Sequence, residues 1–381
     1  MSRTRSEGHH ARSPPDRPRS WLFHVLSCDT PLVRLAAPRC LDGVEQIAIG
    51  RGDVLHPTAT ADEGARERFE FPDRWMSVRH ARIERTVGGF WLADDGSKNG
   101  VLLNGERVDG ALLVDGDWIE IGHTLLRYRL ARFDASHSDD ASTDARALET
   151  MLPSIAARCR DLEDIARSTI PVMLLGETGT GKEVLARAVH RVSGRAGELI
   201  AVNCGALPAS LLEGELFGYR KGAFSSAVAD HPGLVRAADR GTLFLDEIGD
   251  LHPSSQAALL RVLQEREVTP LGDTRPVRVD IRVICATHRD LEARVAAGEF
   301  RADLFARLAG YAFAIPPLRE RREDLGLIAA ALLRRIAPDG DVRFDPEAAR
   351  ALCRYDWPLN VRELEQCLAR AVVLARGGAI G

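Results

Sequence analysis

The stretch VMLLGETGTGKE, residues 172–183, decides the fold of the second half of this 381-residue chain. An apolar run at 172–175 precedes a glycine-rich segment, and the apolar residues of 184–192 then recur on one face of a helix. Glycines let backbone N–H groups wrap phosphates, the helix N-terminus adds partial positive charge, and Lys182 reaches the β- and γ-phosphates. A glycine-rich turn that binds nothing would not need strand, lysine and helix together. The stretch therefore predicts a nucleotide-binding phosphate loop, with cofactor-binding residues Gly176, Glu177, Thr178, Gly179, Thr180, Gly181, Lys182 and Glu183.

A pair of acidic residues, Asp246 and Glu247, follows the apolar run at 243–245. A carboxylate at the end of a buried strand costs several kcal/mol of desolvation, on the order of 2–7, unless a charge compensates it. Close to Lys182 and Mg²⁺, Asp246 is compensated, and it is the expected metal-binding residue. Glu247 is then placed to polarise the water that attacks ATP. With the phosphate loop, these catalytic carboxylates predict an ATPase that uses ATP and Mg²⁺.

The periodicity of apolar residues changes along the chain. Short alternating runs at 21–27, 81–85 and 118–121 indicate a small β-sandwich with tight hairpins. After residue 150, buried-strand patterns at 172–175, 243–245 and 281–285 alternate with helical ones, which favours an α/β layer fold. Only helical patterns follow, at 325–336, 346–355 and 361–375. The turn dipeptides of the sandwich are Gly88-Gly89, Asn99-Gly100, Asn104-Gly105, Asp109-Gly110 and Asp115-Gly116.

We therefore expect a multidomain protein: an N-terminal all-β sandwich, an α/β P-loop domain and a C-terminal all-α subdomain. An arginine- and proline-rich start and an acidic, serine-rich stretch predict a disordered tail and a linker. Within the sandwich, residues 56–68 read as a long inserted loop. The expected boundaries are 1–20 for the tail, 21–133 for the sandwich, 134–149 for the linker, 150–318 for the α/β core and 319–381 for the helical subdomain.

Composition narrows the class of protein. The chain is 45% hydrophobic and 28% charged, with a net charge of −4. Binding to nucleic acid or to an anionic membrane would therefore need a local basic surface. No apolar run reaches the roughly 18 residues of a membrane span. The seven cysteines stand singly, without a CxxC pair, so neither a zinc site nor a disulfide framework is predicted. We expect a cytoplasmic protein without membrane contact.

Residues 150–381 resemble the AAA+ ATPases of sigma-54-dependent activators, the bacterial enhancer-binding proteins. The resemblance rests on GETGTGKE, on LFLDE at 243–247 and on the segments described below. Glu183 stands where phosphate loops commonly have Ser or Thr, and it is the family's form. In this family Asn203 matches the asparagine that holds the catalytic glutamate, and Thr287, in ATHRDL at 286–291, matches the reader of the γ-phosphate. Arg362, in WPLNVREL at 357–364, matches the sensor II arginine, although Leu359 stands where the family has Gly.

The segment FRADLFARL, residues 300–308, matches the arginine-finger region of the family. The resemblance gives Arg301 and Arg307 a catalytic role at the ATP of a neighbouring subunit, where they would neutralise charge on the γ-phosphoryl group. It thus implies self-association into a hexameric ring. An amphipathic helix with solvated arginines is the alternative interpretation of this segment.

The segment ELFGYRKGAFSSA, residues 215–227, is the feature most specific to this family. In relatives the loop reads GAFTGA and grips sigma-54, so the resemblance implies sigma-54 RNA polymerase as a partner. Phe224 suits a contact hot spot on a polar loop. Ser225 keeps the threonine hydroxyl, whereas Ser226 removes the backbone freedom of glycine. The expected partner-binding residues are Gly222, Ala223, Phe224, Ser225, Ser226 and Ala227.

Residues 21–133 resemble a forkhead-associated (FHA) domain, a β-sandwich that reads phosphothreonine. Three patches match in order: GR at 50–51, SVRHA at 77–81 and SKNG at 97–100. The resemblance implies that Arg51 and Ser77 bind phosphate, that Asn99 binds the peptide backbone, and that Arg79 and Lys98 add charge. His80 is expected to brace the loops. Arg51 and Ser77 lie 26 positions apart, longer than the family pattern, because of the stretch at 56–68.

Together the resemblances imply a transcriptional regulator that remodels sigma-54 RNA polymerase with ATP, under the control of a phosphothreonine-bearing protein. Two alternatives stay open. Ser225 and Ser226 leave room for an ATP-driven remodeller of another protein, and a non-catalytic phosphopeptide adaptor would bind nucleotide without turnover. No recognition helix or basic segment follows 372–380, so we expect no direct sequence-specific DNA contact from these residues.

Overall fold

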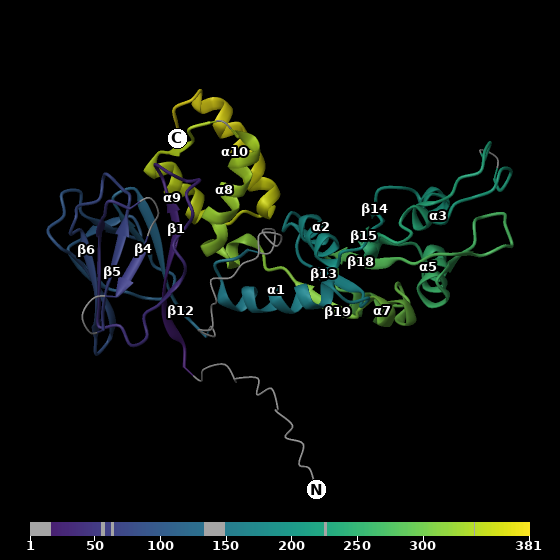
Figure 1. Cartoon of the computed structure of the whole chain (residues 1–381), viewed down its shortest axis with the longest axis horizontal. Helices are drawn as coiled ribbons and strands as arrows, with labels where there is room; N and C mark the ends of the chain where they lie inside the picture. The colour runs from purple at the N-terminus through teal and green to yellow at the C-terminus, as the bar shows by residue number, and fades with distance from the viewer. Residues whose placement is uncertain (1–16, 55–57, 62–64, 133–148, 225–226, 339) are drawn as a thin grey trace, which may run out of the picture.

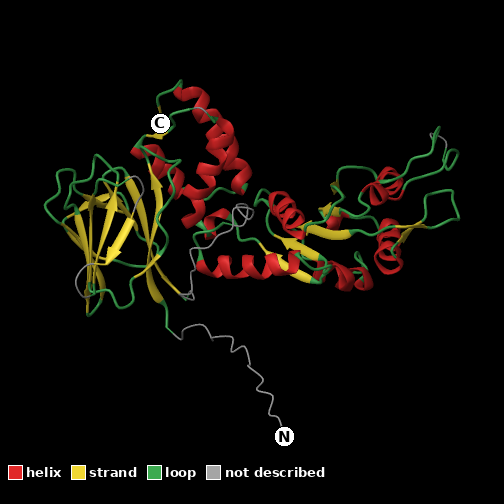
Figure 2. Cartoon of the chain, in the orientation of Figure 1, coloured by secondary structure: helices red, strands yellow, loops and turns green. Residues whose placement is uncertain are grey.

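The computed structural model describes residues 17–54, 58–61, 65–132, 149–224, 227–338 and 340–381. An N-terminal β-sandwich, an α/β domain and a C-terminal group of helices follow one another along the chain (Figure 2). The C-terminal helices, here called the lid, lie between the other two domains (Figure 1). Most of the expected tail and linker, residues 1–16 and 133–148, lies outside the described residues.

The sandwich consists of two six-stranded sheets, ordered β2-β1-β12-β11-β8-β9 and β10-β7-β6-β3-β5-β4. Its core alternates along the strands, as at Ile47 and Ile49 of one sheet and Ile119 and Ile121 of the other. The strands are β1 (Arg19–Ser27), β2 (Arg39–Cys40), β3 (Gln46–Arg51), β4 (Thr58–Ala61), β5 (Arg66–Phe71), β6 (Ala81–Thr86), β7 (Gly89–Asp94), β8 (Val101–Leu103), β9 (Glu106–Val108), β10 (Gly110–Leu112), β11 (Trp118–Ile121) and β12 (Thr124–Ala131).

The stretch at 56–68 is not the long loop that we expected. Its described residues include β4, which pairs antiparallel with β5, while β5 runs parallel to β3. The reason lies in the alternating pattern of β5, which buries Phe69 and Phe71 in the sandwich core. The insertion therefore extends one sheet by a hairpin. The sandwich also begins earlier than expected, because β1 starts at Arg19.

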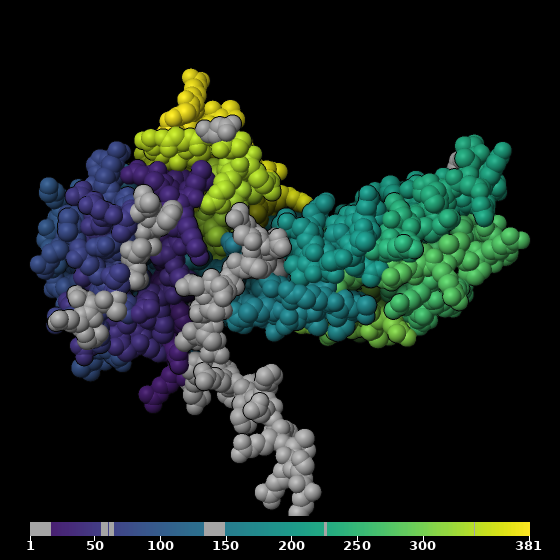
Figure 3. All heavy atoms as spheres, viewed as in Figure 1, coloured from purple at the N-terminus to yellow at the C-terminus, as the bar shows by residue number. Residues whose placement is uncertain are grey.

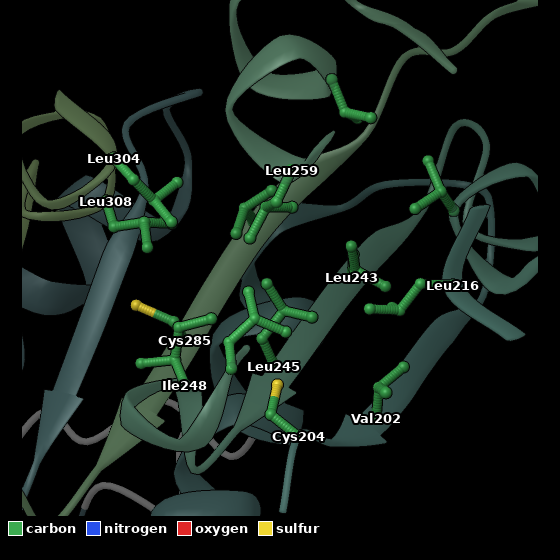
Figure 4. Close-up of a cluster of buried hydrophobic side chains, with 14 of the residues drawn as sticks. Val202, Cys204, Leu216, Leu243, Leu245, Ile248, Leu259, Cys285, Leu304 and Leu308 are labelled. Carbon is green, nitrogen blue, oxygen red and sulfur yellow. The ribbon is translucent and has the colours of Figure 1, made fainter. Parts of the chain in front are cut away.

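The α/β domain is built on a parallel sheet of order β14-β15-β18-β13-β19. One face buries Leu243, Leu245 and Cys285 against Leu259 and Leu304 of two helices (Figure 4). The elements are α1 (Pro153–Ala166), β13 (Val172–Leu175), α2 (Lys182–Ser193), β14 (Leu199–Asn203), α3 (Ala209–Phe217), α4 (Leu234–Ala237), β15 (Thr242–Asp246), η2 (Ile248–Asp250), α5 (Pro253–Glu265), β16 (Glu267–Val268), β17 (Val277–Arg278), β18 (Arg282–Thr287), α6 (Leu291–Ala296), α7 (Ala302–Leu308) and β19 (Tyr311–Ala314).

The sheet register places the expected nucleotide-site residues at one edge. Asn203 pairs with Asp246 across β14 and β15, and Leu175 pairs with Thr287 across β13 and β18. Since parallel strands end together, the phosphate loop, the acidic pair and the Thr287 segment all leave the sheet at its carboxyl edge. This is the edge at which open α/β sheets bind ligands.

The lid consists mainly of three helices. Leu359 adopts an ordinary φ of −98°, and it is Asn360 that takes the left-handed conformation, with φ of 56°. A leucine in place of glycine is therefore accommodated at that turn. Contrary to the purely helical prediction, a short parallel strand pair joins the last residues to the lid. The elements are η3 (Leu318–Glu320), η4 (Arg322–Asp324), α8 (Leu325–Ile336), β20 (Arg343–Phe344), α9 (Pro346–Arg354), α10 (Asn360–Ala375) and β21 (Ala379–Ile380).

No helix within the described residues combines the length and the apolar character that crossing a bilayer requires. All seven cysteines are free, and five of them are buried. In particular, burial raises the pKa of the Cys159 and Cys204 thiols to about 12, so these thiols act as small core side chains.

Candidate nucleotide site and phosphopeptide site

The glycine-rich loop turns sharply between β13 and α2. Gly179 and Gly181 both have positive φ, at 79° and 101°, which L-residues rarely adopt. Lys182, at the start of α2, is only 7% exposed, and its Nζ donates to the backbone carbonyl oxygens of Gly176 at 2.9 Å and Glu177 at 3.2 Å. The loop thus curls around the ammonium group at a helix N-terminus, which is the arrangement that binds phosphates.

The lid closes over this loop. Asn360 Nδ2 donates to Glu177 Oε2 at 3.1 Å and to the Thr178 carbonyl at 3.0 Å, and Val361 N donates to the Gly179 carbonyl at 2.9 Å. A Cβ at Gly179 would lie 2.1 Å from a lid carbonyl oxygen, that of Leu359, so only glycine fits.

Two lid arginines also contact the loop. Arg319 binds both carboxylate oxygens of Glu177, at 2.8 and 2.6 Å, and Arg321 Nη2 donates to the Thr180 carbonyl at 2.9 Å. The Arg319 guanidinium, helped by Asn360, lowers the pKa of Glu177 to about 2. The position of the lid therefore fixes the position of the phosphate loop.

The acidic pair lies beside the loop lysine. Glu247 Oε1 lies 3.9 Å from Lys182 Nζ. Burial lowers the pKa of Lys182, and the charges of Glu247 and Asp246 oppose that shift. Burial also raises the pKa of Asp246, and the neighbouring Glu247 adds to the rise. These carboxylates are thus half-buried at the sheet edge, where the Lys182 ammonium group partly compensates their negative charge.

Glu247 is held by His288 and not by Asn203. His288 Nδ1 lies 2.7 Å from Glu247 Oε2, whereas the Asn203 side chain accepts a bond from Gly205 N at 2.9 Å. Glu247 also has φ of 51° and ψ of 48°, a left-handed conformation that costs a non-glycine residue on the order of 1–3 kcal/mol. Such strain is characteristic of residues whose position serves function. His288 was not among the predicted site residues, although it directly follows Thr287, whose buried hydroxyl accepts a hydrogen bond from Arg289 N.

The remaining expected residues of the α/β domain are exposed. Glu183 pairs with Arg187 at 2.7 Å on the surface of α2. Arg301 precedes α7 and pairs with Asp303 at 2.7 Å, and Arg307 is exposed on the last turn of the same helix. No described contact joins either arginine to the phosphate loop of its own subunit. Arg362, near the start of α10, is also exposed, and its charge contributes to lowering the pKa of Lys182.

The segment expected to bind a partner forms a projecting hairpin at the end of the molecule far from the sandwich (Figure 1). Tyr219 bridges His231, and Phe224, 36% exposed, lies with its ring 4.8 Å from that of Tyr219. Arg220 braces the hairpin base, since it pairs with Asp230 and with Asp273 of a second loop. Ser225 and Ser226 lie outside the described residues.

The expected phosphopeptide residues gather on loops at one end of the sandwich. Arg51 N donates to the Ser77 carbonyl at 2.9 Å, and Lys98 N donates to Ser77 Oγ at 3.2 Å, so the three signature patches meet. Asn99 Nδ2 donates to the Trp75 carbonyl at 2.7 Å. A cavity of about 320 Å³ beside Arg51 is lined by Arg51, Gly52, Asp53, Val54, Pro72 and Arg74.

Two further residues of these loops, His80 and Arg79, differ in burial. His80 is fully buried and lies between Ser77 N, at 2.9 Å, and the Gly100 carbonyl, at 3.0 Å, so it braces the loops as expected. Arg79, in contrast, is 81% exposed and pairs with Asp95 at 3.1 Å. The site thus has buried bracing groups and exposed cationic ones.

A phosphate loop on a parallel sheet, an acidic pair and a helical lid define an AAA+ ATPase domain, here joined to an FHA sandwich. Comparison with known families agrees: the chain matches the Sigma-54 interaction domain over residues 149–314, the AAA+ ATPase lid domain over 319–381 and the FHA domain over 47–122. The chain belongs to the sigma-54-dependent transcriptional regulators.

Individual relatives support this assignment. The anaerobic nitric oxide reductase transcription regulator NorR of Enterobacter sp. is 37% identical, over 95% of this chain and 78% of its own. The hydrogenase transcriptional regulatory protein HoxA of Cupriavidus necator is 51% identical over 59% of this chain and 47% of its own, so the chain spans about half of that relative. The crystal structure of NtrX from Brucella abortus in complex with ADP is 33% identical over 59% of this chain and 50% of that one, with a TM-score of 0.54.

Proposed function

We propose that this protein hydrolyses ATP to remodel sigma-54 RNA polymerase, and that a phosphothreonine-bearing protein controls it through the FHA sandwich. The observation that carries the proposal is the convergence of Lys182, Glu247 and His288 at the carboxyl edge of the sheet. There Lys182 binds phosphate, and Glu247 orients and polarises the attacking water in line with the γ-phosphoryl group.

The donor set fits a nucleotide-borne Mg²⁺. Within the described residues there is no group of three or more His, Cys, Asp or Glu side chains that could hold a metal by themselves. Mg²⁺ in ATPases is commonly held by one or two carboxylates and by substrate phosphates. Asp246 would supply the protein ligand, and the ion would supply charge neutralisation of the phosphates.

The exposed positions of Arg301 and Arg307 support action between subunits. Neither has a described contact with its own phosphate loop, and an arginine that reaches a neighbour's ATP must lie on the subunit surface. We infer that the active form is a ring, hexameric by family precedent. Turnover should then rise with protein concentration, and a mixture of Glu247→Gln and Arg307→Ala subunits should regain turnover only if the arginine acts on a neighbour's site.

The test of the remodelling activity is ATP-dependent isomerisation of sigma-54 polymerase at a promoter. Phe224→Ala should abolish isomerisation and leave ATP turnover within about twofold, because a hot-spot side chain acts only in the contact. Val228→Ala is the matched control, since Val228 is 81% exposed on the same hairpin but outside the GAFSSA stretch. ATP turnover that leaves the complex of polymerase and promoter unchanged would favour a remodeller of another protein. Ser225 and Ser226 are the reason for considering that alternative.

The control by phosphothreonine is tested by binding. The full chain is presented with a degenerate phosphothreonine peptide library, and the selected peptide is then measured with and without its phosphate. Binding that needs the phosphate and Arg51 supports the proposal, and binding indifferent to the phosphate rejects it. If the chain binds this peptide but shows no turnover, and Glu247→Gln changes nothing, the protein is an adaptor.

A further inference from the structure

The sandwich and the lid share one hydrophobic core. Side chains of β1 and β12 and of the lid helices belong to a single buried cluster, and the atoms of the two domains meet without a gap in the view of Figure 3. Domains of one chain move relative to each other by default unless their interface is large and apolar, as it is here. Its buried members include Phe23, Val25, Leu26 and Leu125 of the sandwich and Leu325, Ala329, Leu333, Phe344, Leu352 and Trp357 of the lid.

The backbones of the two domains also touch. A Cβ on Gly326, in α8, would lie 1.7 Å from the carbonyl oxygen of Val25, so only glycine permits this approach. Phe344 N donates to the Cys28 carbonyl at 2.8 Å, which joins β20 of the lid to the end of β1. The contact therefore fixes orientation as well as burying apolar surface.

Ion pairs with buried carboxylates cross the same interface. Glu323 of η4 is 0% exposed and is bound by two arginines of β12, Arg127 at 3.5 Å and Arg129 by a direct hydrogen bond. Nearby, Arg350 of α9 binds Glu120 of β11 at 2.7 Å. Removing one partner of such a pair leaves an uncompensated buried charge, so these contacts resist separation of the domains.

Glu323 belongs to a four-residue junction, residues 321–324, that contacts the sandwich, the α/β domain and the lid helices. Arg321 donates to the Thr180 carbonyl in the phosphate loop at 2.9 Å. Arg322 donates to the lid carbonyl of Arg354 at 2.9 Å, and Glu323 binds the sandwich. Asp324 accepts from Thr150 Oγ1 at 2.7 Å and from Met151 N at 2.5 Å, at the entrance to α1. The phosphate loop and the sandwich are thus held by Arg321 and Glu323, two positions apart in the chain.

The phosphopeptide loops lie close to the same interface. The Asn99 amide donates to the Trp75 carbonyl, and the Trp75 ring stacks on His123 with centroids 4.7 Å apart. The His123 carbonyl accepts from Cys28 N at 2.8 Å, and the Cys28 carbonyl accepts from Phe344 N of the lid. Direct contacts therefore run without a break from the expected peptide site to the lid.

We propose that the sandwich and the lid form one rigid unit, and that phosphopeptide occupancy acts on the nucleotide site through this unit and the 321–324 junction. The proposal rests on phosphopeptide binding, which is part of the proposed function. By this route the signal reaches the phosphate loop within one subunit. Reciprocity then requires that peptide and nucleotide change each other's affinity by the same factor.

The experiment measures both affinities on the full chain. The probes are the library-selected phosphothreonine peptide and a fluorescent, non-hydrolysable ATP analogue. We expect each ligand to change the dissociation constant of the other by about fivefold or more, and equally. In Glu323→Gln and in Gly326→Ala the factor should fall to about one, while each ligand still binds alone. Glu365→Gln is the matched control, because Glu365 pairs with Arg335 within the lid, and it should keep the wild-type factor.

If both ligands bind the wild-type chain and neither changes the dissociation constant of the other, the coupling is overturned. It is also overturned if both interface variants keep the wild-type change in dissociation constant. A chain that binds no phosphopeptide rejects the proposed function instead. The rigid unit is then tested by spin labels at Val87 of the sandwich and Val373 of α10, which are both exposed. One narrow distance, unchanged by the ATP analogue, supports the unit, and a broad or shifting distribution overturns it.

Discussion

The chain contains an ATP site and a proposed phosphopeptide site, and the two differ in how far their cationic side chains are buried. In the AAA+ domain the cation is Lys182, which is 7% exposed and enclosed by its own loop. In the FHA sandwich the cations are exposed on loop tips, and Arg79 is 81% exposed. Buried groups interact strongly but must be compensated in place, whereas exposed ones are screened by water and salt.

This difference in burial fits a catalytic role for the nucleotide site and a binding role for the peptide site. The nucleotide site combines a lysine whose pKa burial lowers, a strained Glu247 and a lid that contacts the loop, as expected of a site that fixes a reaction geometry. The peptide site keeps its braces, such as His80, buried and leaves its contacts open to a protein ligand. Substitutions should therefore change rates at the first site and affinities at the second.

The largest expected effect is at the nucleotide site. Glu247→Gln should lower ATP turnover by about 10²–10⁴-fold, because it removes the group that polarises the attacking water, and should leave nucleotide binding intact. Steady-state hydrolysis and binding of a fluorescent ATP analogue measure the two quantities. Asp164→Asn is the control, since Asp164 pairs with Arg167 on the surface at the end of α1, and it should keep near-normal turnover. Equal turnover in Glu247→Gln and the wild type would contradict the assignment.

The next effect is at the peptide site. Arg51→Ala should weaken phosphopeptide binding by about tenfold to hundredfold, as loss of a charge-assisted hydrogen bond predicts. Arg79→Ala should cost less, because Arg79 is highly exposed and already paired with Asp95. Calorimetry at two salt concentrations measures the peptide affinities of both variants. Higher salt should weaken binding of the peptide more than binding of the nucleotide. An Arg79 effect as large as that of Arg51 would show that the peptide lies elsewhere on the loops.

A smaller effect is expected from the residue that holds the catalytic glutamate. His288→Ala should lower turnover by about tenfold with unchanged nucleotide affinity, since it removes one hydrogen bond to a charged group. His288→Asn should restore part of the rate, because an amide can still donate to Glu247. If Asn203→Ala lowers turnover and His288→Ala does not, the glutamate is held by Asn203 during turnover.

Local patterns could be predicted from the sequence. The lid helix α8 has the limits expected from its periodicity, Leu325–Ile336, and the phosphate loop lies between a strand and a helix as GETGTGKE indicated. The alternation that buries Phe69 and Phe71 was missed, because the polar residues before it resembled a loop.

Pairings between distant positions could not be predicted. Asn203 and Thr287 end the strands on either side of β15, so the segments after both strands lie beside Glu247. Only side-chain geometry selects His288, which follows Thr287, as the partner of Glu247 in place of Asn203. The contact of Glu323 with Arg129 joins residues 194 positions apart, and no local sequence pattern predicts it.

The smallest effect concerns the lid contact with the phosphate loop. Arg319 lowers the pKa of Glu177 from 4.5 to about 2, so the ion pair stabilises the folded state above pH 4.5 and this contribution is lost as the pH falls through about 2. The Glu177 side chain is 42% exposed, so Glu177→Gln should cost at most about 1 kcal/mol of unfolding free energy at neutral pH. Urea denaturation from pH 7 down to pH 3 measures it, and the gap between wild type and variant should narrow below pH 4.5. A gap that widens on acidification would mean that the Asn360 contact, and not the charge on Glu177, holds the lid on the loop.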